Sequence, residues 1–275
     1  MKRFSWFKNF GFLFVFGFFQ SCEKVNYSKD WEIVFEEDFS NGLDTNSVWR
    51  KNFPWFRFNY NQIYLNKNAS IREGKLNLVA KRQEFWGKGV TYLDSLDILH
   101  DDKPNYRRFD YSSGMLFLNN KYKFGKFEIR CKIPKGKGLW PAFWLYGACG
   151  EEIDIFEFDC EFTKDVHTAR HKEVFCDDGK TYHFPSKYNL GLDFSSDFHI
   201  YSLEWTNNRI AWYIDEELIR EEIKFNDYAY SNSFPDSALN LIVNLAVTGS
   251  FVKSEPELSI NDSAVFLIDY IKIYK

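Results

Sequence analysis

A row of acidic side chains stands in one short segment of the chain. Residues 150–159 read Gly-Glu-Glu-Ile-Asp-Ile-Phe-Glu-Phe-Asp. If this segment is a β-strand, Glu152 and Asp154 point to one face, because alternate residues of a strand share a face. Simple alternation would place Phe156 next on that face, so Glu157 joins the other two acids only if one extra residue forms a β-bulge. Like charges on one face repel, so a purely structural strand rarely carries such a row.

Cleavage of a glycosidic bond is the chemistry that these acids could serve. It needs one ionised and one protonated carboxyl group flanking the bond, about 5–5.5 Å apart in retaining enzymes. A straight strand would separate the Cα atoms of Glu152 and Glu157 by roughly 13 Å or more, so the strand must curve and both side chains must lean inward. Asp154 lies between them and could orient Glu152. A cation site and a solvated outer face are the alternative interpretations.

The segments around the acids are predicted to be strands. An aromatic share of 20% with only two Met favours strands over helices. Turn signals separate these segments, and Asp215-Glu216 is predicted to be a hairpin tip. We predict one all-β domain over residues 30–275, a sandwich or jelly roll whose concave surface can hold an extended ligand. Alternating or β-branched segments recur at 31–35, 75–80, 126–133, 199–205, 210–214, 239–245 and 265–274.

The flanks of the acidic segment carry a family resemblance. Residues 124–158, FGKFEIRCKIPKGKGLWPAFWLYGACGEEIDIFEF, resemble the signature region of glycoside hydrolase family 16. The resemblance covers essentially residues 30–275. It implies a β-jelly-roll sandwich of two antiparallel sheets with a substrate cleft on the concave sheet. The spacing Glu-x-Asp-x-x-Glu resembles the branch of laminarinases, agarases and carrageenases. Other segments resemble further strands of the family in the same order: 31–49, 198–219, 239–251 and 266–275.

The resemblance assigns a role to each acid. Glu152 aligns with the nucleophile, Glu157 with the general acid/base and Asp154 with the assisting carboxylate. It implies a retaining endo-β-glycanase acting by double displacement, with a β-1,3-glucan of the laminarin type as the expected substrate. The alternatives are a marine galactanase acting on agarose, carrageenan or porphyran, a transglycosylase, and a non-catalytic carbohydrate-binding lipoprotein. The three intact acids argue against the last.

Four residues are expected to bind the polysaccharide. Trp140 and Trp144 resemble family residues that line sugar subsites, and aromatic faces stack well on a pyranose; core packing is the alternative. His167 resembles a His that lies near the acid/base on the next strand, and His171 is given less weight. Asn59 lies in a segment that loosely resembles one that binds sugar hydroxyls.

Two positions depart from the family pattern in regions that recognise the substrate. Tyr60 stands where laminarinases commonly carry Glu, and Met115 stands where many members carry Arg. A sulfated galactan would call for a basic cleft, to which Arg107, Arg108 and Arg170 could contribute.

A structural calcium ion is the one metal that the resemblance implies, away from the cleft. Asp38 and Asp269 match its side-chain ligand positions, and Gly74 matches a backbone donor. Two carboxylates with carbonyl oxygens suit a hard cation, and two solvated acids are the alternative. No cofactor is expected for catalysis.

Two tryptophans and one cysteine are expected inside the sandwich. Trp205 and Trp212 lie in regular strands, and alternation places Cys131 on an apolar face as a buried free thiol. An exported context permits disulfides. The pairing of three further cysteines is left open: Cys149, Cys160 and Cys176.

The N-terminus is predicted to direct export. Three basic residues precede an uncharged run of ten residues, 10–19, which is too short for a bilayer span of about 20 residues but suits a signal peptide. We predict a signal peptide over residues 1–21, a lipidated Cys22 and a tether over 22–29. An ordinary cleaved signal is the alternative.

Removal of the signal lowers the formal net charge from −4 to about −7. The chain shows no Lys/Arg cluster of the kind that binds nucleic acid. The predicted protein is a monomer, attached to the outer membrane or the cell surface by its lipid, or periplasmic. Its predicted partner is a polysaccharide.

Overall fold

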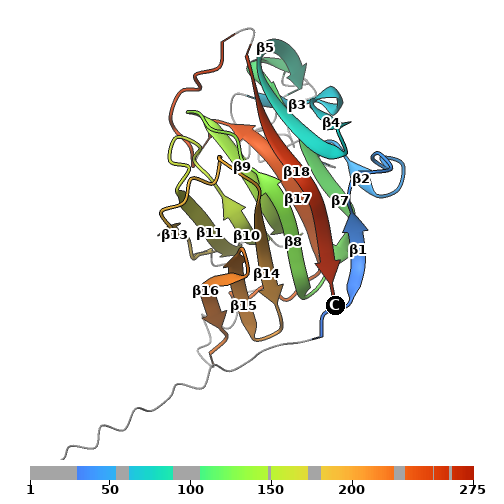
Figure 1. The fold of residues 1–275 in the computed structure, drawn as a ribbon, viewed down its shortest axis with the longest axis vertical. Helices are drawn as coiled ribbons and strands as arrows, with labels where there is room; N and C mark the ends of the chain where they lie inside the picture. Colours follow the sequence, from blue (N-terminus) through green and yellow to red (C-terminus); the bar gives the residue numbers. More distant parts are fainter. Residues whose placement is uncertain are drawn as a thin grey trace, which may run out of the picture. The chain divides into compact units, whose positions relative to one another are not determined.

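Two stacked β-sheets make up the described part of the protein (Figure 1). The computed structural model describes residues 30–53, 62–88, 106–147, 150–172, 181–225, 233–249, 251–259 and 262–275, and every structural statement below refers to these. Contacts group Trp31–Lys275 into one compact unit. Besides one 3-10 turn, η1 (Asn66–Asn68), the described elements are strands, which confirms the all-β prediction. No helix in these ranges is long and apolar enough to cross a bilayer.

The first sheet has ten strands, paired antiparallel except where β3 and β6 run parallel. In addition to its main path, β1 (Ile33–Glu37) pairs with β18, and β4 (Ala69–Arg72) pairs with β5. The main path runs in the order β16 (Glu217–Ile223), β15 (Arg209–Ile214), β14 (His199–Trp205), β8 (Gly125–Lys132), β18 (Ser263–Tyr274), β5 (Lys75–Lys88), β6 (Tyr106–Ser113) and β3 (Gln62–Tyr64).

The second sheet has eight antiparallel strands and carries the acidic segment in β10. β13 (Ser186–Asn189) pairs with β11 beside the main path. Figure 1 shows β18 of the first sheet lying across β17 of the second. The main path runs in the order β12 (Tyr182–His183), β11 (Asp165–Lys172), β10 (Glu151–Glu157), β9 (Leu139–Tyr146), β17 (Leu239–Val247), β7 (Met115–Tyr122) and β2 (Trp49–Arg50).

The core fills the space between the sheets because alternate side chains of each strand point into it. In β9 and β10, Phe143, Leu145 and Ile153 belong to this core and are fully buried. Each such side chain contributes roughly 1.5–3 kcal/mol to folding through removal of apolar surface from water. The predicted core tryptophans Trp205 and Trp212 are both fully buried, as expected.

The other side of the second sheet carries the acids, and we name it the acidic face, defined by Glu152, Asp154 and Glu157. An apolar cluster lies on this face beyond the acids. It consists of Phe53, Met115, Phe117, Ala142, Trp144 and Ile242, with Tyr64 and Tyr146 packed against it. Because β9, β17 and β7 are neighbours, this cluster extends from the acids across three strands.

Two turns in the fold depend on unusual backbone positions. Asp215 and Glu216 form the predicted hairpin tip between β15 and β16, with φ values of 48° and 69°. Gly114 joins β6 to β7, where the chain passes from one sheet to the other. A Cβ atom at this position would collide with the carbonyl of Asn68, so only glycine allows the close approach.

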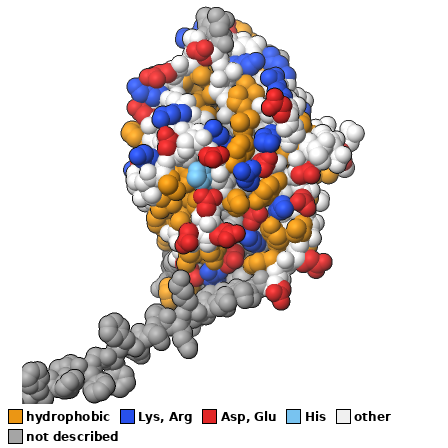
Figure 2. Space-filling view, viewed as in Figure 1, with side chains coloured by type: hydrophobic (Ala, Val, Ile, Leu, Met, Phe, Trp, Pro, Cys, Tyr) orange, Lys and Arg blue, Asp and Glu red, His pale blue; other side chains and the backbone are white. Residues whose placement is uncertain are grey.

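Charged side chains of both signs are interspersed on the face seen in Figure 2. Typical pairs in the first sheet are Lys126 with Glu128, 2.8 Å apart, and Lys272 with Glu36, 3.0 Å apart. This face therefore lacks the single-sign field that binds a phosphate backbone.

Candidate active site

The predicted β-bulge is present in β10 and brings the third acid to the acidic face. Asp154 pairs with Trp144 of β9, but Phe156 already pairs with Phe143, so one residue of β10 is extra. Ile155 and Phe156 both point into the core as a result, and both are buried there. Glu157 therefore returns to the side that carries Asp154.

The three acids differ in exposure. Asp154 is 2% exposed, whereas Glu152 and Glu157 are half-buried. The backbone carbonyl of Asp154 accepts a 2.9 Å hydrogen bond from Nε1 of Trp212, which reaches across the core from β15. This bond anchors the strand directly before the bulge, and so helps to fix the spacing between the two glutamates.

Trp140 contacts the predicted acid/base directly. Its Nε1 donates a 2.8 Å hydrogen bond to Oε1 of Glu157. The indole ring lies 5.4 Å from the ring of Phe251, centroid to centroid. The half-buried Trp140 is thus held on the acidic face beside Glu157, and its place in a sugar subsite stays a prediction. An N–H donor at this point stabilises the ionised form of the carboxyl group.

Trp144 lies on the same face but is covered. It is 5% exposed, and its Nε1 donates a 2.7 Å hydrogen bond to Oδ1 of Asn244. Phe53 packs edge-on against the ring at 6.3 Å. This burial does not support the predicted stacking of a sugar on Trp144. The ring instead packs within the apolar cluster of this face, which agrees with the alternative of core packing.

His167 lies opposite Glu157 in the neighbouring strand β11. Its ring stands edge-on to Phe251 at 4.6 Å. Burial, aided by the positive charge of Lys187 and opposed by Asp165, lowers the pKa of His167 from 6.5 to about 4. The imidazole is therefore neutral at neutral pH, and next to Glu157 it can act as a hydrogen-bonding group without adding a positive charge.

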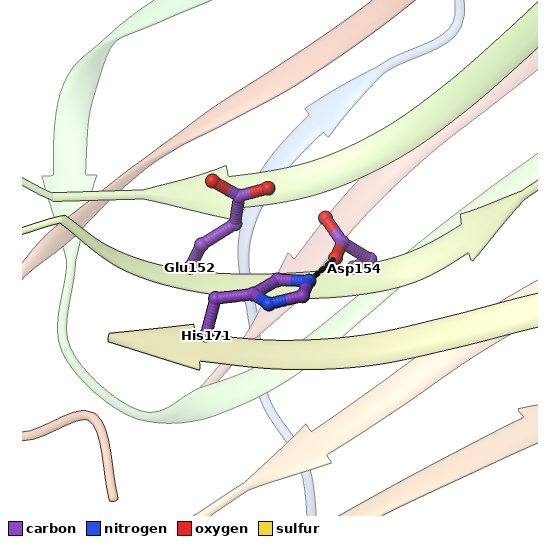
Figure 3. Close-up of side chains that lie close together, drawn as sticks. All are labelled: Glu152, Asp154 and His171. Carbon is purple, nitrogen blue, oxygen red and sulfur yellow. Dashed lines mark ion pairs between the residues drawn. The ribbon is translucent and has the colours of Figure 1, made fainter. Parts of the chain in front are cut away.

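His171 contacts the acids more closely than its place in the sequence indicated. Its Nε2 lies 3.2 Å from Oδ2 of Asp154, and it is paired with Glu152 across the strands (Figure 3). Its Nδ1 lies 2.7 Å from Nδ1 of His183 on β12. Alternate residues of a strand share a face, so the sequence places His171 on the same face of β11 as His167. No sequence pattern near His183 indicates that it lies beside His171.

One further predicted substrate residue, Asn59, and two positions that depart from the family pattern remain to be placed. Asn59 and Tyr60 lie outside the described residues. Met115 is fully buried within the apolar cluster of the acidic face. An Arg at that position would need a partner for its charge there, so the departure from the family pattern agrees with the apolar surroundings.

Three arginines could contribute to a basic cleft: Arg107, Arg108 and Arg170. Arg170 is fully buried and pairs with Glu222 at 2.8 Å, on the core side of β11. Arg108 pairs with Asp110 at 2.6 Å, on β6 of the other sheet. Arg170 therefore does not line the cleft, and the charge of Arg108 is offset by a neighbouring carboxylate. The side chain of Arg107 lies outside the described part.

The predicted calcium ligands are engaged with other partners. Asp269 pairs with Arg130 at 2.5 Å and with Lys75 at 3.2 Å. Asp38 is exposed and accepts hydrogen bonds from the backbone N–H and the hydroxyl of Ser40. Two cations already offset the charge of Asp269, so these side chains as arranged do not fit a calcium ion. Gly74 has a φ of 68° in the turn before β5.

Two cysteines are described, and both are free and buried. Cys131 is a buried free thiol, as predicted, and Cys160 is another. Burial raises the pKa of both thiols well above the usual value. Cys149, Cys176 and the N-terminal segment with Cys22 lie outside the described residues, so their predictions stay untested.

Paired carboxylates on the open side of a β-sandwich define a class of protein. Glu152 and Glu157 share a face, Asp154 lies between them, and an indole N–H donates to Glu157. Two carboxyl groups with different environments on one face are what glycosidic cleavage requires. The fold and the site therefore define a β-sandwich glycoside hydrolase.

Comparison with known proteins identifies the family. The family model described as "Glycosyl hydrolases family 16" matches residues 56–265. A glucan endo-1,3-beta-glucosidase of Cryptopygus antarcticus is 31% identical over 267 residues, covering 88% of this chain and 91% of that protein. Glucan endo-1,3-beta-glucosidase A1 of Niallia circulans is 31% identical over 237 residues, which cover 78% of this chain but 32% of that longer protein.

A solved structure agrees. The laminarinase catalytic domain of Thermotoga maritima superposes with a TM-score of 0.71 at 27% identity, covering 90% of this chain and 99% of that one. The chain belongs to glycosyl hydrolase family 16 and is a glycoside hydrolase.

Proposed function

We propose that the protein is a retaining endo-β-1,3-glucanase. The observation that carries the proposal is the bulge, which places Glu152 and Glu157 on one face with an indole donor on the second glutamate. The relatives named above are glucan endo-1,3-beta-glucosidases, and the solved neighbour is a laminarinase.

The reaction proceeds in two displacements. Glu152 attacks the anomeric carbon while Glu157 protonates the leaving oxygen, and a covalent glycosyl-enzyme forms. Glu157 then removes a proton from water, which attacks the same carbon and releases Glu152. The hydrogen bond from Trp140 stabilises Glu157 in its ionised form, which is the form that activates the water.

A neutral glucan fits the described acidic face better than a sulfated galactan. Arg108 and Arg170 pair with carboxylates away from this face, and His167 is uncharged at neutral pH. A sulfate group in a partly dehydrated cleft needs a paired positive charge. These observations favour laminarin over the sulfated galactans carrageenan and porphyran.

Substitution of each glutamate tests the mechanism. Glu152→Gln and Glu157→Gln should each lower kcat on laminarin by several orders of magnitude while the protein stays folded. Glu217→Gln, at an exposed position on β16, is the matched control and should keep full activity. Full activity in either active-site variant would overturn the assignment. NMR of the first-formed product should show retention at the anomeric carbon, and an inverted product excludes a nucleophilic Glu152.

A polysaccharide panel tests the substrate. Release of reducing ends from laminarin, and none from carrageenan, agarose or porphyran, is the expected result. Strong activity on any of these three galactans would replace the glucanase proposal with the galactanase alternative. Transfer of the glycosyl group to added oligosaccharide in place of water would show a transglycosylase.

We also propose that the protein is exported and anchored by a lipid on Cys22. The basic N-terminus, the uncharged run 10–19 and Ser21-Cys22 support this proposal. Radiolabelled palmitate should enter the wild-type protein but not Cys22→Ala, which should leave the membrane fraction. Equal labelling of both would contradict lipidation at this residue.

A further inference from the structure

Three metal-ligating side chains converge at one end of the acidic row. Glu152 and Asp154 come from β10, and His171 comes from the neighbouring strand β11 (Figure 3). One donor atom from each lies within 4.8 Å of the others, and this is the one such group of three found among the described residues. The catalytic roles proposed above involve Glu152 and Asp154 but not His171.

Asp154 provides a second, independent observation. The residue is 2% exposed, yet its Oδ2 has no hydrogen-bond partner among the described residues. A buried carboxylate oxygen without such a partner is costly. Its short contact is with Nε2 of His171, at 3.2 Å. The unsatisfied oxygen therefore points at the imidazole nitrogen.

The spacing of these two atoms suits a metal ion between them. Zn²⁺ lies about 2.0–2.1 Å from imidazole nitrogen and from carboxylate oxygen in tetrahedral sites, so two ligands of one ion are about 3.3 Å apart. The observed separation of Asp154 Oδ2 and His171 Nε2 is 3.2 Å. The flexible Glu152 side chain is near enough to supply a third ligand, and both Glu152 and His171 are partly exposed.

His183 supports the orientation of His171. The two Nδ1 atoms lie 2.7 Å apart, so one ring donates to the other and Nε2 of His171 is turned towards Asp154. A metal-binding histidine commonly has its second nitrogen held by such a partner, which fixes the tautomer and the ring orientation. His183 thus holds a position typical of a residue behind a metal ligand.

We propose that Glu152, Asp154 and His171 bind a divalent transition-metal ion such as Zn²⁺, and that the bound ion blocks the active site. An imidazole with two carboxylates selects Zn²⁺ or Cu²⁺ over Mg²⁺ and Ca²⁺, which prefer oxygen ligands throughout. A bound ion engages the carboxylate of Glu152, so the ion and the polysaccharide exclude each other. Binding of the metal ion does not depend on the proposed glucanase activity. Only the inhibition of hydrolysis by the bound ion rests on that proposed function.

Calorimetric titration of the full chain with ZnCl₂ tests the site. We expect one ion per chain. His171→Ala should weaken Zn²⁺ binding by at least about tenfold, and His183→Ala by about tenfold through loss of the supporting contact. His199→Ala is the matched control, because His199 also contacts a single carboxylate, that of Asp215 at 2.7 Å, but in the other sheet. Its Zn²⁺ affinity should equal that of the wild type.

Thermal unfolding provides a readout that requires no hydrolysis. Zn²⁺ should raise the Tm of the wild type and of His199→Ala, but not that of His171→Ala, because a ligand stabilises only the state that binds it. Ca²⁺ and Mg²⁺ at the same concentration should leave the Tm unchanged. Absence of Zn²⁺ binding, or equal affinity in wild type and His171→Ala, overturns the proposal. Zn²⁺ binding without any laminarin hydrolysis would instead count against the proposed function alone.

Discussion

At the scale of single residues, the two glutamates are distinguished by their neighbours. Glu157 receives an indole hydrogen bond from Trp140 and faces the neutral His167 across the strands. Glu152 instead faces His171, which contacts Asp154. Different neighbours are what allow two chemically identical groups to take different roles in one reaction.

Trp140→Phe should shift the pH–rate profile. Phenylalanine keeps an aromatic ring but removes the N–H that stabilises ionised Glu157. A hydrogen bond to a charged group contributes about 1.5–3 kcal/mol, so the alkaline limb of kcat/KM on laminarin should move up by about one to two pH units. Trp86→Phe removes a similar bond, from Trp86 to exposed Glu84, and should leave the profile unchanged. A profile unaltered by Trp140→Phe would contradict this role.

His167 should titrate far below its usual range. NMR of the ring protons should give a pKa of about 4, since burial disfavours the charged form. Between pH 6.5 and 4 the unfolded chain then binds more protons at this residue than the folded one. The stability that His167 contributes is present above pH 6.5 and is lost as the pH falls towards 4. His167→Gln should reduce that pH dependence, and a titration near pH 6.5 would show that the ring is solvated.

At the scale of elements, the bulge in β10 links the fold to the chemistry. It turns Ile155 and Phe156 into the core together and returns Glu157 to the acidic face. The carbonyl of Asp154 at its start accepts a hydrogen bond from Trp212 of β15, so a strand of the opposite sheet constrains the strand that carries the acids. Bulges near active sites commonly redirect a side chain in this way.

Trp212→Phe should impair both stability and catalysis. It leaves the buried carbonyl of Asp154 without its indole partner, which costs about 1–3 kcal/mol. The bulge then loses an anchor, and kcat on laminarin should fall. Trp49→Phe is the matched control, because Trp49 is fully buried and donates to Glu37 at 3.0 Å in a strand far along the sheet. In urea unfolding both should lose stability, but only Trp212→Phe should lower kcat at saturating substrate.

At the scale of the whole molecule, the two sheets enclose a continuous core that contains both described thiols. Cys131 and Cys160 are fully buried, and burial raises the pKa of each. A thiol reacts as its thiolate, so both are inert while the sandwich is closed. Modification of these thiols therefore reports separation of the sheets.

Thiol labelling should follow global unfolding. Under native conditions a maleimide should not modify the peptides that contain Cys131 and Cys160, as read by mass spectrometry. Labelling should rise across the same urea range in which the tryptophan fluorescence changes, because exposure of the core requires cooperative opening. Rapid labelling of Cys131 in the native protein would show local opening near β8.

Much of the fold was predictable because strands leave a local signal. Seven segments were predicted from alternation, and β14 was found with the predicted bounds, 199–205. β6 and β7 were missed because neither alternates cleanly. β6 mixes charged and aromatic residues, and β7 begins with a run of four apolar residues. Local sequence describes the faces of one strand but not its passage between two sheets.

The sequence by itself was enough to propose which residues carry the chemistry, because the acids, the bulge and Trp140 all lie within one local stretch whose alternation sets its faces. Only the tertiary structure decided what surrounds them. The pairing of β11 with β12 brings His171 next to His183, and the apolar cluster on β9 buries Trp144. Glu222 forms an ion pair with Arg170. These contacts connect residues on different strands, and strand register and burial are set by the packing of the whole sandwich, which no local pattern encodes.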